Sequence, residues 1–159
     1  MISYDDAVTM ILDNVQTLLP VTRPISQALG LILAEPVLSK FDLPPADNSA
    51  MDGYAFNFNG LPEDQTLRQI AFVAAGDFFS GSVAAAETVK IMTGAPVPEG
   101  CDTVVPIEDV TVDGERIILQ RPQKRGSHVR YQGEEIAQGE VALPAGALIN
   151  SGAIGQLAS

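Results

Sequence analysis

The densest group of residues capable of chemistry lies between Asp47 and Ala55. This stretch reads Asp-Asn-Ser-Ala-Met-Asp-Gly-Tyr-Ala and is separated by one residue from the turn-forming pair Pro44-Pro45. Short polar side chains of this kind bond the local backbone, so a structured loop is one interpretation. Loops on a rigid scaffold also carry functional groups. Met51 and Tyr54 can anchor such a loop to an apolar body, which would leave the carboxylate of Asp52 free for a ligand.

A second chemically active segment is Ile91–Gly100. Thr93 and Gly94 form a turn signal here, and Pro96 and Pro98 stiffen the chain that follows. The hydroxyl of Thr93 and the backbone amides of the turn could donate hydrogen bonds to an anion.

A third segment, Arg130–Ile136, places a cationic side chain next to two adjacent acids. For Glu134 and Glu135, a functional carboxylate pair and a solvated acidic turn after a glycine both fit the pattern. Arg130 could attract an anion such as phosphate, and an ordinary basic surface residue is the alternative. The residues alone leave these interpretations open.

These blocks resemble the signatures of the MoeA family, the molybdopterin molybdenumtransferases, which include the E domain of gephyrin and its plant counterpart. Asp47–Ala55 is similar to the hallmark of that family, Ile91–Gly100 to its other N-terminal signature, and Arg130–Ile136 to its arginine-then-Gly-Glu-Asp motif. The blocks occur in the family's order, and the resemblance extends over essentially the whole chain. One position departs from the pattern, because the family more often has Glu-Asp where this chain has Glu134-Glu135. The extra methylene keeps the charge but moves the carboxylate.

The resemblance implies a role in molybdenum cofactor biosynthesis. Enzymes of this family insert molybdate into adenylylated molybdopterin and release AMP, with magnesium assisting. Their first domain supplies much of a homodimer interface, and a molybdopterin adenylyltransferase-type protein is a further expected partner. Cleaving a phosphoanhydride beside oxyanions requires acids that hold a hard cation and donors that steady the oxygens.

The same resemblance implies roles for individual residues, position by position. The expected catalytic residues are Asp52, Thr93 and Glu135, and the expected substrate- or anion-binding residues are Glu134, Arg130 and Gly94. No protein metal ligand is assigned. Asp47 and Asn48 are expected to form an Asx-type turn that aims the loop.

The composition disfavours several classes of protein. A formal net charge of −11 over 159 residues argues against a nucleic-acid binder and against docking on an anionic membrane. The single cysteine, Cys101, cannot form an internal disulfide and is expected to be a small buried hydrophobe. The sequence shows no signal peptide and no apolar run of membrane-spanning length, which predicts a cytoplasmic protein.

Both ends of the chain have the pattern of a helix-and-strand scaffold. Ser3 and Asp6 form a capping pair, and apolar residues at helical spacing predict a helix that ends at Pro20. A short helical turn after Pro24, with Ile25, Ala28 and Leu29 facing inward and Gly30 as a left-handed cap, and a strand over Leu31–Val37 are expected next. Near the other end, the sequence predicts a strand at Val141–Leu143 and a helix that Asn150 or Ser151 caps and that contains Ile154 and Leu157.

The middle of the chain consists of short apolar runs separated by turn residues, which is typical of an all-β unit. Strands are expected over Ile70–Ala75, Val89–Met92 and Thr103–Ile107. The clearest hairpin signal runs from Val110 and Val112 through Asp113-Gly114 to Leu119.

The predicted fold class is therefore α+β and β-rich. An elongated helix-plus-strand scaffold domain comprises residues 1–44 together with 136–159, and a compact β-barrel-like lobe, residues 45–135, is inserted into it. The predicted final helix is short for an independent helix, and the family's Ser-Gly-Gly and Thr-Gly-Asp loops do not occur in this sequence. We therefore expect an N-terminal fragment that supplies a cleft wall and the dimer interface, lacks the pterin-binding domain and is inactive alone.

Two other functions stay open at this point. One is a non-catalytic scaffold or protein-binding module of the gephyrin type. The other is a free-standing acidic hydrolase that uses Asp52 with Glu134 or Glu135 as an acid and base pair.

Overall fold

The computed structural model describes residues 2–159, which form two compact units. The terminal unit comprises the residues up to Val37 together with Leu143–Ser159, and the central unit comprises Leu38–Ala142. In this division, residues 38–44 and 136–142 fall in the central unit. Backbone hydrogen bonds join these two segments to each other, as in the 2.8 Å bond from the Leu43 N–H to the Ile136 carbonyl. Among residues 2–159, neither helix has the length and apolar character needed to cross a bilayer.

The first helix of the terminal unit is α1, Tyr4–Asn14. The Asp6 N–H donates to the Ser3 side chain at 3.1 Å, which confirms the predicted N-cap. The predicted end at Pro20 is wrong, because Val15 is already extended with ψ near 126°. No apolar residue of α1 is buried, so tertiary packing does not prolong the helix past Asn14. The Asn14 side chain donates to the Met10 carbonyl in the last turn.

The next part of the terminal unit has less regular structure than the sequence predicts. The turn after Pro24 is the 3₁₀ helix η1, Ile25–Gln27, and Gly30 adopts the expected left-handed conformation at φ +80°. Ala28 is buried as predicted, but Ile25 and Leu29 are exposed. The strand over Leu31–Val37 is wrong as well. Before Val37, which begins strand β1 (Val37–Leu38), this stretch contributes an isolated bridge from Ile32 to Leu148 and backbone hydrogen bonds at Leu31 and Leu33.

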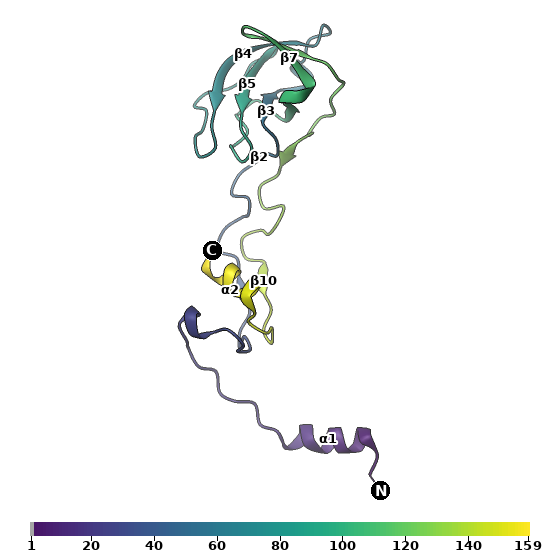
Figure 1. The fold of residues 1–159 in the computed structure, drawn as a ribbon, viewed down its shortest axis with the longest axis vertical. Helices are drawn as coiled ribbons and strands as arrows, with labels where there is room; N and C mark the ends of the chain where they lie inside the picture. The colour runs from purple at the N-terminus through teal and green to yellow at the C-terminus, as the bar shows by residue number, and fades with distance from the viewer. Residues whose placement is uncertain (1) are drawn as a thin grey trace. The chain divides into compact units, whose positions relative to one another are not determined.

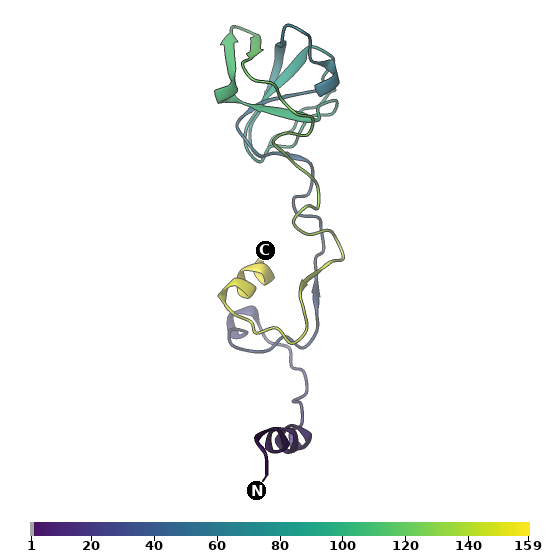
Figure 2. The same ribbon diagram turned by 90° about the vertical axis from the view of Figure 1, so that its right-hand side faces the viewer.

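The second helix, α2, spans Ser151–Ala158 and is capped by Asn150, whose side chain accepts the Ala153 N–H at 2.9 Å. This confirms the prediction. α2 lies beside η1 in both views (Figures 1 and 2), and Ala153 forms a small core with Ala28 and Ile149. Ile154 and Leu157 pack against that core, as their spacing predicts.

The central unit is built on a six-stranded sheet with the order β6-β3-β5-β4-β8-β7. Its strands are β3 (Gly53–Phe56), β4 (Thr66–Val73), β5 (Glu87–Ile91), β6 (Thr103–Pro106), β7 (Val110–Asp113) and β8 (Arg116–Leu119). The pair β4 and β5 is parallel and the other neighbours are antiparallel. The sheet curls on itself, as Figure 2 shows, which confirms a β-rich, half-barrel architecture. The predicted hairpin is present, with Asp113 opposite Arg116.

Two smaller pairings complete the strands. β2 (Asn48–Ser49) pairs antiparallel with β9 (Val129–Arg130), and β1 (Val37–Leu38) pairs with β10 (Val141–Leu143). β10 is the strand that the sequence predicts. The pairing of β2 with β9 brings two of the chemically active segments together.

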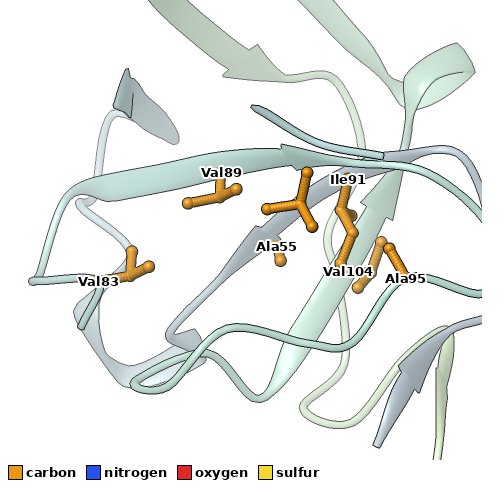
Figure 3. Close-up of a cluster of buried hydrophobic side chains, with 7 residues drawn as sticks. Ala55, Val83, Val89, Ile91, Ala95 and Val104 are labelled. Carbon is orange, nitrogen blue, oxygen red and sulfur yellow. The ribbon is translucent and has the colours of Figure 1, made fainter. Parts of the chain in front are cut away.

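Both faces of β3 are buried, because its successive residues enter different cores. In β3, Ala55 enters one cluster while Tyr54 and Phe56 enter the other. Figure 3 shows the first cluster, in which Val89 and Ile91 of β5 lie near Ala55 and Val104. Tyr54, Ala55 and Phe56 are at most 2% exposed, so β3 is a rigid mount for the residues that precede it.

Candidate functional site

The loop before β3 is fixed by backbone hydrogen bonds to two other segments. Ser49 is 1% exposed; its N–H donates to the Ala95 carbonyl at 2.9 Å, and its carbonyl accepts the Gly94 N–H at 2.8 Å. On the other side, the Ala50 N–H donates to the His128 carbonyl at 2.9 Å. The loop therefore lies between the Thr93–Ala95 turn and strand β9.

Asp52 and Thr93 come together as a hydrogen-bonded pair. Oδ1 of Asp52 accepts both the Thr93 N–H and the Thr93 hydroxyl, each at 2.7 Å. These bonds, the backbone one foremost, lower the pKa of the Asp52 carboxyl from its ordinary value. Oδ2 accepts no hydrogen bond from residues 2–159. Asp52 thus presents an ionised, exposed oxygen whose direction is fixed by Thr93.

The position directly after Asp52 has room only for a glycine. A Cβ on Gly53 would lie 2.0 Å from the Val105 carbonyl oxygen of β6, a distance that no side chain tolerates. The Ile107 N–H also donates to the Asp52 carbonyl at 3.0 Å. The close approach of β3 and β6 therefore sets the backbone position of Asp52.

The Thr93–Ala95 turn has no free amide for an anion. The Thr93 N–H is used by Asp52, the Gly94 N–H by Ser49, and the Ala95 N–H donates to the Met92 carbonyl at 3.0 Å. Gly94 has φ +82°, and a Cβ there would meet nothing within 4 Å. The expectation that these amides bind an anion is therefore wrong, and what Gly94 contributes is an open surface next to Thr93.

Arg130 joins Glu134 and Glu135 in a second cluster. Its Nε donates to Oε1 of Glu134 at 2.6 Å, and its Nη2 donates to Oε1 of Glu135. The Tyr131 N–H donates to the other oxygen of Glu134 at 2.8 Å. The pairing with Arg130 and then the Tyr131 bond lower the pKa of Glu134, while Glu134 and then Glu135 raise the pKa of Arg130.

The six predicted site residues thus fall into two clusters. We call Asp52, Thr93 and Gly94 the Asp52 cluster, and Arg130, Glu134 and Glu135 the Arg130 cluster. Within residues 2–159 no hydrogen bond or ion pair joins one cluster directly to the other. They are linked through the loop, because Asn48 of β2 is opposite Arg130 of β9.

Asp47 has a different role from the predicted Asx-type turn. Its Oδ1 accepts the Gln132 N–H at 2.8 Å, which is a long-range bond to the chain before the acidic turn. The local turn is made by Ser49, whose hydroxyl donates to the Met51 carbonyl at 2.6 Å and accepts the Met51 N–H. Sequence reasoning does not single out Ser49. The only signal in the sequence is a serine inside a polar loop, since a serine hydroxyl can bond the backbone two residues further on.

A pocket of about 370 Å³ lies on the central unit and contains none of the six predicted residues, although Asp47 and the neighbours of Arg130 help to line it. It is lined by Asp47, Val97, Cys101, Asp102, Arg125, Gly126, Val129 and Tyr131. Burial and the charge of Asp102 raise the pKa of Cys101 to about 12, so this thiol stays protonated. Cys101 is partly buried and packs against the first core cluster, whereas the sequence predicts a buried residue. Among residues 2–159 no group of three or more His, Cys, Asp or Glu side chains is arranged to hold a metal ion.

Comparisons with known proteins agree with this architecture. Residues 2–159 match the family model described as the MoeA N-terminal region, domains I and II. A crystal structure of the molybdopterin biosynthesis MoeA protein from Pyrococcus horikoshii superposes with a TM-score of 0.91 at 29% sequence identity, covering 99% of this chain and 43% of that one.

Curated relatives carry the name molybdopterin molybdenumtransferase. The protein from Haemophilus influenzae is 36% identical over 137 residues, covering 85% of this chain and 34% of its own length. A Mycobacterium tuberculosis protein, molybdopterin molybdenumtransferase 2, is 32% identical over 145 residues, covering 88% and 36%. The chain therefore spans about a third of the length of these relatives.

Proposed function

Because this chain belongs to the MoeA family, whose N-terminal region it matches over residues 2–159, we propose that it is the N-terminal part of a molybdopterin molybdenumtransferase. In this proposal the complete enzyme works in molybdenum cofactor biosynthesis in the cytoplasm. It inserts molybdate into adenylylated molybdopterin and releases AMP. The chain described here supplies one wall of the active-site cleft, and the rest of the enzyme supplies the pterin-binding domain.

The observation that carries the proposal is the pairing of Asp52 with Thr93. Two hydrogen bonds of 2.7 Å to Oδ1 fix the carboxylate and keep it ionised, while Oδ2 accepts none from residues 2–159. Such an oxygen suits a reaction that gathers phosphate and molybdate oxyanions, because these need a counter-cation. Asp52 is therefore the residue to which we assign the central catalytic role.

The donor set of the Asp52 cluster fits magnesium in a limited way. Magnesium keeps several waters and takes its other ligands from one or two carboxylates and from substrate phosphates. Asp52 would supply one such carboxylate, and the substrate would complete the shell. When bound, the ion would neutralise charge on the oxyanions. Asp52 directs its oxygen, Thr93 fixes that direction, and Gly94 leaves room beside it.

The Arg130 cluster is assigned to the substrate anion. Arg130 uses Nε and Nη2 for the two acids, and a guanidinium carries five N–H donors, so further donors are available to an oxyanion. Glu134 fixes the guanidinium through Nε. Glu135 holds the Nη2 end and places a second carboxylate at the wall, which is its assigned part in catalysis.

The proposed dimer surface includes helix α1. Within α1 no residue is buried, and Tyr4, Ile11 and Leu12, which share one side of the helix, are all more than half exposed. An apolar helix face of this kind calls for a partner surface, and a second copy of the enzyme meets that need. A molybdopterin adenylyltransferase-type protein is the proposed source of the adenylylated substrate.

The test uses the complete enzyme, meaning the whole reading frame that encodes these residues. Molybdate-dependent release of AMP from adenylylated molybdopterin is measured for the wild type, for Asp52→Ala and for the 159-residue chain alone. We expect activity in the wild type, none in the short chain, and a loss of about a hundredfold in Asp52→Ala. Asp77→Ala is the matched control, because Asp77 is an exposed acid in the turn after β4 and takes part in neither cluster. Full activity in a folded, dimeric Asp52→Ala enzyme would refute the assignment.

The two other functions make different predictions in the same assay. A free-standing hydrolase would need Asp52 close to Glu134 or Glu135, but no hydrogen bond or ion pair joins Asp52 to either acid within residues 2–159. The lowered pKa values of Asp52 and Glu134 also disfavour either group as the protonated acid. A non-catalytic binding module would leave the wild type without AMP release.

A further inference from the structure

Segment 42–47 makes three side-chain hydrogen bonds to the chain on either side of the acidic turn at Glu134 and Glu135. Asp42 Oδ2 accepts the Gln132 side-chain Nε2–H at 2.6 Å, and its Oδ1 accepts the Gln138 N–H at 2.8 Å. Asp47 Oδ1 accepts the Gln132 N–H at 2.8 Å. Two carboxylates thus hold Gln132 by its side chain and its backbone, and Asp42 spans the turn from residue 132 to residue 138.

The backbone between these acids strengthens the same connection. The Leu43 carbonyl accepts the Glu135 N–H at 2.9 Å, and the Pro44 carbonyl accepts the Gly133 N–H at 3.0 Å. Pro44 is itself buried, so this part of the segment is anchored to the body of the central unit. Hydrogen bonds from residues 42–47 therefore reach the turn that carries Glu134 and Glu135, on both sides of Glu134.

The segment also reaches the other cluster. The Asp47 carbonyl accepts the Val97 N–H at 2.8 Å, just after the Thr93–Ala95 turn, and the chain continues through Ser49 to Asp52. One continuous stretch of backbone thus positions both the Asp52 cluster and the Arg130 cluster, which share no direct hydrogen bond or ion pair within residues 2–159.

We infer that Asp42 is a positioning residue that clamps the acidic turn and so sets Glu135 in register with Asp52. The inference rests on the proposed function, because it assigns Asp42 a part in the same reaction. Asp42 contacts no reacting group and acts through Gln132 and Gln138. Fixing catalytic groups relative to each other is worth large factors in rate, since a misplacement of about 1 Å can cost a hundredfold.

The clamp predicts a contrast between two substitutions in the complete enzyme. Asp42→Ala removes both acceptors, and we expect kcat to fall about tenfold with little change in KM for molybdate. Asp42→Asn can restore both bonds, because its oxygen accepts the Gln138 N–H and its amide group donates to Gln132 once that side-chain amide rotates. We expect Asp42→Asn to stay within about twofold of the wild type. A residue that served only through its negative charge would lose equally in both variants.

Amide hydrogen exchange provides a readout that does not depend on turnover. In Asp42→Ala, a peptide spanning residues 131–139 should exchange faster than in the wild type, while Asp42→Asn and the control Asp77→Ala should not change it. If Asp42→Ala fails to fold, Gln132→Ala replaces it, because this variant removes the Nε2 bond and keeps the backbone bond to Asp47.

The outcomes separate the inference from the proposed function. Wild-type enzyme without AMP release refutes the proposed function, and exchange then still shows whether the clamp exists. Active wild type with Asp42→Ala equally active, or with Asp42→Asn as impaired as Asp42→Ala, overturns the inference and leaves the proposed function standing.

Discussion

The Asp52 cluster and the Arg130 cluster hold their carboxylates in opposite ways. Asp52 is fixed by neutral donors, the N–H and hydroxyl of Thr93, so its negative charge is uncompensated. Glu134 and Glu135 are fixed by the guanidinium of Arg130, so much of their negative charge is compensated. The first arrangement invites a cation. The second suits a surface that an oxyanion has to approach without strong repulsion.

The two clusters also differ in how the fold supports them. Asp52 immediately precedes β3, whose residues are almost completely buried. The acidic turn instead follows the two-residue strand β9 and depends on hydrogen bonds to segment 42–47. We therefore expect the Asp52 cluster to be disturbed mainly through the core, and the Arg130 cluster through polar contacts at the surface.

The largest expected effect comes from Gly53→Ala, which disrupts the packing of β3 under the Asp52 cluster and leaves the Arg130 cluster unchanged. Its new Cβ would lie 2.0 Å from the Val105 carbonyl oxygen, so β3 and β6 would have to separate. We expect the free energy of unfolding to fall by about 3 kcal/mol. Thermal unfolding followed by circular dichroism measures this.

Gly155→Ala is the control for that prediction. Gly155 lies inside α2, and a Cβ there would meet nothing within 4 Å. The same substitution should therefore stabilise the protein by about 0.5–1 kcal/mol, since alanine is the better helix former. Equal destabilisation by both variants would show that the close approach of β3 and β6 is not what matters at Gly53.

The next effect in size is the loss of the Thr93 hydroxyl. Thr93→Ala keeps the backbone N–H to Asp52 but removes the second donor, and we expect kcat for AMP release to fall about tenfold. Thr93→Ser keeps the hydroxyl and should stay within about twofold of the wild type. Equal losses in the two variants would mean that the methyl group of Thr93, rather than its hydrogen bond, is what the site needs.

The sequence predicts those parts of the fold that local rules determine. The Ser3 and Asn150 caps, the hairpin at Asp113 and the left-handed Gly30 all follow from short-range chemistry, and the structure has them. Helix α1 is shorter than its periodicity predicts because no packing within α1 buries its apolar stripe. Apolar periodicity predicts which residues could share a helix face, but the helix is stable only where that face packs against another surface.

The site follows the same division. The resemblance supplied the residue types of both clusters, and the hydrogen bond from Thr93 to Asp52 agrees with them. What the sequence could not supply are bonds between distant segments, such as the Asp47 bond to Gln132, 85 positions away. Nor could it show that the amides of the Thr93–Ala95 turn are already used, because their acceptors become neighbours only in the folded chain.

A smaller effect is expected from Arg130→Gln. The pairs of Arg130 with Glu134 and Glu135 are exposed, and exposed ion pairs are weak, so we expect kcat for AMP release to fall only about threefold. Arg130→Lys should lose less, because lysine keeps the positive charge and lacks only the fork that contacts both acids. The deficit should shrink at high ionic strength, whereas that of Thr93→Ala should not. A salt-independent loss would show that Arg130 does more than balance charge.

The smallest effect is a change in titration, and it separates the clusters most directly. The carboxyl pKa values of Asp52 and Glu134 are both lowered by folding. Each group therefore stabilises the fold fully above the ordinary carboxyl range of about 4, and its contribution is lost as pH falls through the lowered value. Carboxyl NMR titration of the wild type and two variants resolves the two groups. Thr93→Ala should raise the pKa of Asp52 and leave Glu134 unchanged, while Arg130→Gln should raise the pKa of Glu134 and leave Asp52 unchanged. If either variant shifts both carboxyls, the clusters share one electrostatic field, and the neutral donors at Asp52 do not isolate it from Arg130.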